Sequence, residues 1–134
     1  MADKYELYYL EDPVEENDFD GFSELRGKTP AMVVGDDLTV TNMTRLKKAL
    51  QSRSVNAIIV KPNQNGSLLK VKEICDFCKS KEIAIVFSHR SGETLDTTIA
   101  DLALAWKADF IKTGIFGKER EAKLNRLIQI EKVL

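Results

Sequence analysis

Five short apolar runs, each followed by a segment with helical periodicity, constrain the fold of this chain more than any other feature. The runs have the length and the β-branched or aromatic composition of strands, and they cover residues 7–10, 31–34, 57–60, 83–87 and 110–111. Their nearly continuous hydrophobicity is typical of parallel strands that helices cover. The sequence therefore predicts alternating strands and helices, with a parallel sheet and right-handed connections.

The segments between the apolar runs place apolar residues on one helical face. We predict helices over residues 19–25, 41–50, 68–78, 93–106 and 118–133, the first of them short. Thr41 is the expected N-cap of the second helix, because a hydroxyl can accept a hydrogen bond from the first turn. Residues 2–5 have the character of a helix end that precedes the first strand.

A charged or titratable residue ends every apolar run. These residues are spaced 23 to 28 positions apart, and they are Glu11, Asp36, Lys61, His89 and Lys112. In a parallel α/β barrel the C-terminal strand ends point into one shared opening, so residues far apart in sequence converge there. One such residue alone is explained by a solvated strand end, but the recurrence favours a common site.

The types of charge at these strand ends indicate two kinds of chemistry. Glu11 and Asp36 offer only oxygen ligands, which suit Mg²⁺ better than zinc or copper. Lys61 and Lys112 end apolar strands, where burial and mutual repulsion favour the neutral amine that a base requires. The alternatives are that the acids cap helices or form salt bridges, and that the lysines simply neutralise them.

The segment SHRSGET at residues 88–94 combines a fixed cation, hydroxyls, glycine and an expected helix start, which are the components of an anion site. Arg90 and Ser91 are the candidate phosphate contacts. A single histidine is usually structural, but the strand-end position of His89 favours a side chain that faces a ligand. The turn at Lys112 repeats the combination of cation, hydroxyl and glycine.

Composition and the cysteines exclude several other classes of function. Lys plus Arg (20) nearly equals Asp plus Glu (21), so no nucleic-acid or membrane surface driven by bulk charge is expected. The sequence lacks a signal pattern and a long apolar segment, which favours a cytoplasmic protein. Cys75 and Cys78 could be half of a zinc site or a redox pair, but their i, i+3 spacing on an apolar helix face favours buried thiols.

Five motifs together resemble the enolase family, or phosphopyruvate hydratases, over essentially the whole chain. They are EDP at 11–13, GDDLTVTN at 35–42, VKPNQNGS at 60–67, SHRSGET at 88–94 and IKTG at 111–114. The resemblance implies one domain over residues 1–134 that forms the C-terminal portion of a TIM barrel, with about five of its eight strands and the helices outside. The N-terminal domain and the first barrel strands of such enzymes are absent from this sequence.

The resemblance also implies Mg²⁺-dependent dehydration of 2-phosphoglycerate to phosphoenolpyruvate, a glycolytic reaction with two metal sites in the family. By match of motifs, Glu11 and Asp36 resemble metal ligands and Lys61 resembles the base that takes the C2 proton. The residues that resemble substrate contacts are His89, Arg90, Ser91 and Lys112, with Gln64 as a neighbour in the pocket.

A third metal ligand and a pair of acid glutamates belong to the portion of the family that this sequence lacks. Five strands cannot close an eight-stranded barrel, so open strand edges and apolar faces are expected to need cover. We therefore expect self-association into an oligomer or a complementing N-terminal half. The alternative is a catalytically incomplete, enolase-like module that binds an anionic ligand or a protein partner.

Overall fold

The computed structural model describes residues 5–134, and the chain divides into two compact units after Ile85. The first unit contains β1 (Tyr9–Glu11), α2 (Phe19–Lys28), β2 (Met32–Gly35), α3 (Met43–Gln51), β3 (Ala57–Val60), α4 (Pro62–Asn65) and α5 (Leu68–Ser80). The boundary falls inside β4 (Ala84–Ser88), and the second unit continues with α6 (Thr98–Ala105), β5 (Phe110–Lys112) and α7 (Lys118–Glu131). The helix end expected at residues 2–5 lies almost wholly outside the described residues.

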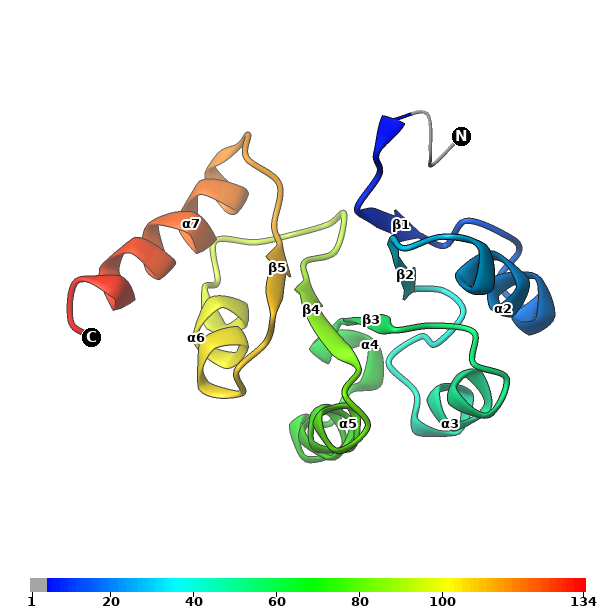
Figure 1. Ribbon diagram of the computed structural model, residues 1–134. Coiled ribbons are helices and arrows are strands. Elements are labelled where there is room, and N and C mark those ends of the chain that lie inside the picture. The colour runs from blue at the N-terminus through cyan, green and yellow to red at the C-terminus, as the bar shows by residue number, and fades with distance from the viewer. Residues whose placement is uncertain (1–4) are drawn as a thin grey trace. The chain divides into compact units, whose positions relative to one another are not determined.

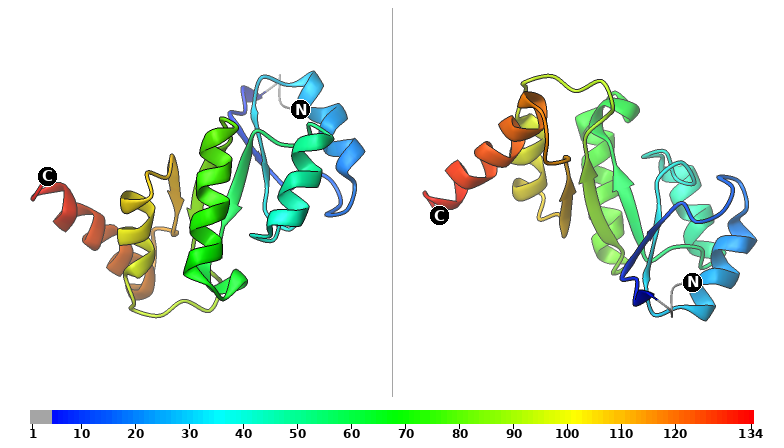
Figure 2. Two further views of the ribbon diagram at one scale, coloured as in Figure 1. Left: turned by 90° about the horizontal axis from the view of Figure 1, so that it is seen from below. Right: turned by 90° about the horizontal axis from the view of Figure 1, so that it is seen from above.

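The first unit contains three parallel strands in the order β1-β2-β3. Tyr9 lies opposite Met32, and Val34 lies opposite Ala57. Every residue of β2 and β3 is buried, as the continuous hydrophobicity predicted. Helices α2, α3 and α5 lie on one side of these strands (Figures 1 and 2). Their fully or almost fully buried side chains supply the helical part of the core, namely Phe22, Leu46, Ala49, Val71, Ile74, Cys75 and Cys78.

The second unit pairs β4 with β5, again in parallel, and both of its helices lie on the same side of β5 (Figure 1). Ser88 lies opposite Lys112 in this register. The ring of Phe87 meets Trp106 edge to face, with 5.9 Å between the ring centroids. Arg126 on α7 forms an ion pair with Asp101 on α6 at 2.6 Å, which joins the two helices of the unit.

The predicted strands agree with the observed ones to within two residues, but the helix predicted over 93–106 was wrong at its start. The helix α6 begins only at Thr98. The Thr94 hydroxyl accepts the Asp96 N–H, and the Asp96 carboxylate accepts the Thr98 N–H. Such local bonds offer the backbone an alternative to helical hydrogen bonding, so residues 93–97 remain a loop.

The N-cap prediction for α3 was also wrong by one residue. Asn42, not Thr41, caps the helix, because its side-chain oxygen accepts the N–H groups of Thr44 and Arg45. Thr41 has a positive φ of 50°, and its hydroxyl accepts the Lys61 N–H instead. Thr41 therefore positions the end of β3.

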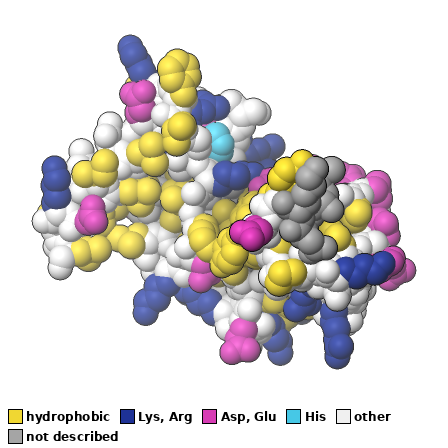
Figure 3. Space-filling view, turned by 45° about the horizontal axis from the view of Figure 1, so that its top comes forward, with side chains coloured by type: hydrophobic (Ala, Val, Ile, Leu, Met, Phe, Trp, Pro, Cys, Tyr) yellow, Lys and Arg dark blue, Asp and Glu magenta, His cyan; other side chains and the backbone are white. Residues whose placement is uncertain are grey.

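Large hydrophobic side chains are exposed on the second unit, as the face shown in Figure 3 illustrates. Ile115 and Phe116, in the loop after β5, are 86% and 89% exposed. Leu104, Phe110 and Ile128 are also exposed. Among the helices of the described chain, none combines the length and the apolarity that a bilayer crossing requires.

The buried thiols that the sequence predicts are confirmed on α5. Both Cys75 and Cys78 are fully buried and not disulfide-bonded. Burial raises the pKa of the Cys75 thiol to about 11 and that of the Cys78 thiol to about 12.

These thiols should resist modification in the folded protein, because the reactive thiolate is scarce and the sulfur atoms are covered. We expect no reaction with an aromatic disulfide reagent at neutral pH and complete reaction of both cysteines after denaturation. Absorbance of the released thiolate measures this directly. Rapid reaction of either cysteine in the native protein would contradict the packing of α5.

Candidate active site

The first unit brings three of the predicted site residues to one edge of its strands. Glu11 is the last residue of β1, Asp36 follows β2 directly, and Lys61 follows β3 directly. The three strands are parallel, so their C-terminal ends lie along the same edge. The expectation that charged residues gather where the strands end is thus confirmed for this unit.

Lys61 and Asp36 form an ion pair between the ends of β3 and β2. The Lys61 Nζ lies 2.6 Å from each carboxylate oxygen of Asp36, and Asp36 is only 7% exposed. A buried charge is tolerated when it is paired in this way, and removal of one partner leaves the other uncompensated. The lysine therefore compensates the buried charge of the acid in this structure.

A hydroxyl fixes the backbone that carries Lys61. The Lys61 N–H donates to the Thr41 hydroxyl oxygen at 2.9 Å, and the same hydroxyl donates to the side-chain oxygen of Gln64 at 3.2 Å. Gln64 lies on α4, the single turn that begins at Pro62, immediately after Lys61. The structure thus joins Lys61 and Gln64, two of the residues expected near the pocket, through Thr41.

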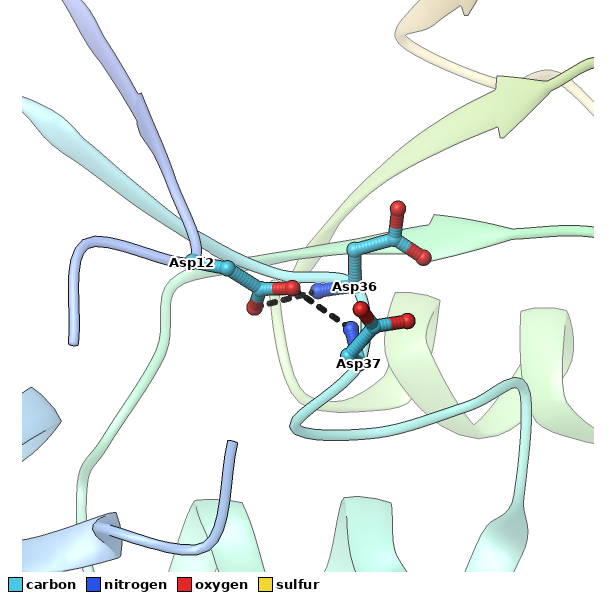
Figure 4. A group of neighbouring side chains, drawn as sticks. All are labelled: Asp12, Asp36 and Asp37. Carbon is cyan, nitrogen blue, oxygen red and sulfur yellow. Dashed lines mark hydrogen bonds between the residues drawn. The ribbon is translucent and has the colours of Figure 1, made fainter. Parts of the chain in front are cut away.

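Asp12 organises the acidic residues at this edge (Figure 4). Its carboxylate accepts the Asp36 N–H at 2.9 Å and the Asp37 N–H at 2.6 Å. The carboxylates of Asp12, Asp36 and Asp37 each offer an oxygen within 4.8 Å of the others. The sequence analysis assigned no role to Asp12, although its place directly after the strand-end residue Glu11 was a usable signal.

The Glu11 carboxylate accepts a hydrogen bond from the Tyr9 hydroxyl at 3.0 Å. Burial raises the pKa of Tyr9 far above its ordinary value, and the carboxylates of Glu11, Asp36 and Asp12 raise it further. Three carboxylates therefore disfavour ionisation of the Tyr9 hydroxyl. The donors gathered here are carboxylate oxygens, which fit a hard divalent cation such as Mg²⁺.

The second unit brings together the other predicted site residues. His89 follows β4, Lys112 ends β5, and the His89 N–H donates to the Lys112 carbonyl oxygen at 3.0 Å. The Arg90 N–H donates to the Glu93 carboxylate at 2.9 Å. The Ser91 carbonyl accepts a hydrogen bond from Arg120 at 3.4 Å.

The imidazole of His89 lies in a partly buried, cationic environment. Burial lowers its pKa, Arg120 lowers it further, and Lys112 and Lys123 add to this effect against an opposing contribution from Glu93. Its Nδ1 atom is buried without a hydrogen-bond partner among residues 5–134. At neutral pH the ring is therefore held in its neutral form.

Asp12→Asn should destabilise the protein, because hydrogen bonds from backbone N–H groups to a charged acceptor are stronger than those to a neutral one. We expect a loss of about 1–2 kcal/mol in the free energy of unfolding, measured by urea denaturation. Asparagine also tolerates the positive φ of 40° at this position, so backbone strain does not contribute. Asp37→Asn, at an exposed acid of the same cluster, serves as the control and should change stability by less than about 0.5 kcal/mol. Equal effects of the two substitutions would refute the organising role of Asp12.

The single histidine should titrate with a midpoint below its ordinary value of 6.5, as followed by NMR of its ring protons. Arg120→Gln should raise the midpoint, since a nearby cation disfavours the imidazolium. The unfolded chain binds this proton more readily than the folded one, so His89 should lower stability as pH falls below 6.5. A midpoint at or above 6.5 would be inconsistent with this environment.

Comparison with known proteins identifies the fold to which these units belong. The whole chain, residues 1–134, matches the family described as "Enolase, C-terminal TIM barrel domain". The chain is 47% identical over 134 residues to the enolase of Archaeoglobus fulgidus, covering all of this chain and 34% of that protein. It is 49% identical over 133 residues to the enolase of Sulfolobus acidocaldarius and 50% identical over 133 residues to that of Sulfurisphaera tokodaii, covering 98% of this chain and 32% of each relative.

The chain thus spans about a third of the length of these relatives. Parallel strands that alternate with helices are the units of a TIM barrel, so the predicted fold class is confirmed. Both the sequence match and the βα units support the same assignment. The chain therefore belongs to the enolase family, as a part of its C-terminal TIM barrel domain.

Proposed function

We propose that this chain contributes the proton-abstracting and substrate-binding residues of an enolase reaction, the dehydration of 2-phosphoglycerate to phosphoenolpyruvate in glycolysis. The observation that carries this proposal is the ion pair of Lys61 and Asp36 at the strand-end edge, beside Asp12 and Asp37. A lysine that is fixed next to a cluster of oxygen ligands has the components of metal-assisted proton abstraction.

Asp36 and Glu11 are the residues that would hold Mg²⁺ in the first unit. When bound, the ion supplies positive charge that stabilises a carboxylate substrate as it gains further negative charge. The burial of Asp36 and its place beside Asp12 and Asp37 support its part in this assignment. The place of Glu11 at the end of β1 supports its part. The family uses two such ions, and the ligands named here belong to one of them.

Lys61 is the proposed base for the C2 proton of the substrate. Its main chain is fixed by Thr41, and its Nζ contacts Asp36, so both ends of the residue are positioned before substrate arrives. The contact with Asp36 thus holds the Nζ atom at the acidic edge, where the proposed metal ligands gather.

The second unit carries the residues proposed to bind the substrate's anionic groups. Arg90 and Ser91 would hold the phosphate by charge-assisted hydrogen bonds, and Lys112 would lie beside the carboxylate. The neutral imidazole of His89 would line the same pocket. The location of these four residues at the ends of β4 and β5 supports the assignment.

The proposed reaction also uses residues that the resemblance assigns to another portion of the family fold. The resemblance assigns a third metal ligand and the acid glutamates to that portion, and the chain spans about a third of its relatives. The exposed hydrophobic residues of the second unit, such as Phe116, support contact with a complementing half or with a second copy. We place the reaction in the cytoplasm, in keeping with unpaired Cys75 and Cys78.

The test is to mix the purified chain with a polypeptide covering the remaining two-thirds of the Archaeoglobus fulgidus enolase. Enolpyruvate absorbance with 2-phosphoglycerate and Mg²⁺ should rise only in the mixture. Lys61→Met should lower the rate by a factor of about 10² to 10⁴, the usual contribution of a positioned base. Lys132→Met, at an exposed lysine, is the matched control and should retain activity. No activity in any mixture of folded pieces would count decisively against this function.

A second candidate function is an incomplete enolase-like module that binds an anionic ligand or a protein. The exposed hydrophobic residues of the second unit, such as Phe116, favour it. Calorimetric titration with 2-phosphoglycerate and Mg²⁺ separates the two candidates. Tight association with a protein partner and no heat from the ligand would favour the module.

A further inference from the structure

A buried lysine on α7 contacts the loop that carries the proposed phosphate ligands. Lys123 is 1% exposed. The sequence pattern predicted instead that apolar side chains form the buried face of this helix. Its Nζ lies 2.7 Å from the Glu93 carboxylate and donates to the Thr94 carbonyl oxygen. Burial of an ammonium group is costly unless it is paired and hydrogen-bonded, so these contacts account for its position.

Glu93 links Lys123 to the backbone of the loop. One carboxylate oxygen binds Lys123, and the other accepts the Arg90 N–H at 2.9 Å. Burial alone would raise the pKa of Glu93, but the Arg90 N–H and Lys123 outweigh it and lower the pKa below its ordinary value. At neutral pH the carboxylate is therefore charged and can bridge the helix to the loop.

Arg120, one turn earlier on α7, makes a second contact with the same loop. It donates to the Ser91 carbonyl, and its side chain crosses Gly114 in the turn after β5. A Cβ atom at Gly114 would lie 3.2 Å from the Arg120 Cγ, and the φ of this glycine is +69°. Glycine thus leaves the space that Arg120 uses to reach the loop.

We propose that Lys123, acting through Glu93, is a positioning residue that fixes the loop of His89, Arg90 and Ser91 for anion binding. This inference rests on the proposed function, which assigns those three residues to the substrate. A helix is a firmer support than a loop, and binding groups held by buried neighbours keep the geometry that recognition needs. Arg120 supports the same loop from the preceding turn.

Amide hydrogen exchange of the Arg90 N–H tests the contact chain directly. Lys123→Met keeps the length of the side chain but removes its charge, so the Arg90 amide should exchange about tenfold faster or more. Amides in the middle of α6 should stay within about a factor of two. Lys123→Arg should restore much of the protection, because a cation of similar reach is returned. Lys118→Met, at an exposed lysine of the same helix, is the matched control and should leave the Arg90 amide unchanged.

A second variant keeps the test decisive if Lys123→Met does not fold. Glu93→Gln preserves the shape of the bridge and weakens both of its bonds, so it should also accelerate exchange at Arg90. The ring signals of His89 should shift in Lys123→Met and Glu93→Gln but not in Lys118→Met. Unchanged Arg90 exchange in a folded Lys123→Met or Glu93→Gln protein would overturn the positioning role.

Binding of 2-phosphoglycerate with Mg²⁺, measured by calorimetry in parallel, separates this inference from the proposed function. Weaker binding by Lys123→Met, by about tenfold, is expected together with the faster exchange. If the unchanged chain gives no binding heat, alone and mixed with the complementing polypeptide, while Lys123→Met still loses protection at Arg90, the proposed function fails and the contact chain stands. If binding is retained and Arg90 stays protected in every variant, the positioning role fails and the proposed function stands.

Discussion

The ion pair of Lys61 and Asp36 joins the ends of two parallel strands, and the edge of the first unit is arranged around it. Parallel strands end at one edge, so residues that follow them are crowded together whatever their charge. Asp12 binds the N–H groups of Asp36 and Asp37 and so holds the backbone of this acidic turn. Thr41 does the same for Lys61. The charges of the edge are thus positioned by hydrogen bonds to the main chain.

The second unit also contains a lysine–carboxylate pair, but here the lysine comes from a helix and not from the end of a neighbouring strand. Lys123 compensates Glu93, and Glu93 in turn binds the main chain of Arg90. In both units a lysine with little exposed surface is paired with a carboxylate, and a backbone N–H near a predicted site residue is satisfied by a side-chain oxygen. Such pairs are weak evidence for stability, but they fix geometry, which is what a binding site requires.

Local sequence patterns predicted the strands, the parallel order and the strand-end positions of the charged residues, because each depends on the residues of one element. The assignment to the enolase family followed from five motifs and is confirmed by the comparison. The start of α6 and the cap of α3 were predicted wrongly because of local side-chain bonds. Two further roles were missed because their side chains act at a distance. Asp12 binds main chain 24 and 25 residues away, and Lys123 binds a loop about 30 residues away. The apolar periodicity of α7 gave no sign that a lysine would be its buried residue.

The edge-to-face contact of Phe87 and Trp106 has a practical value because the chain contains one tryptophan. Trp106 and Phe87 both belong to the second unit, and Phe87 lies two residues before His89. Tryptophan emission consequently reports the packing of that unit, whereas circular dichroism sums the helices of both. Superposition or separation of the two signals during denaturation distinguishes one cooperative transition from two.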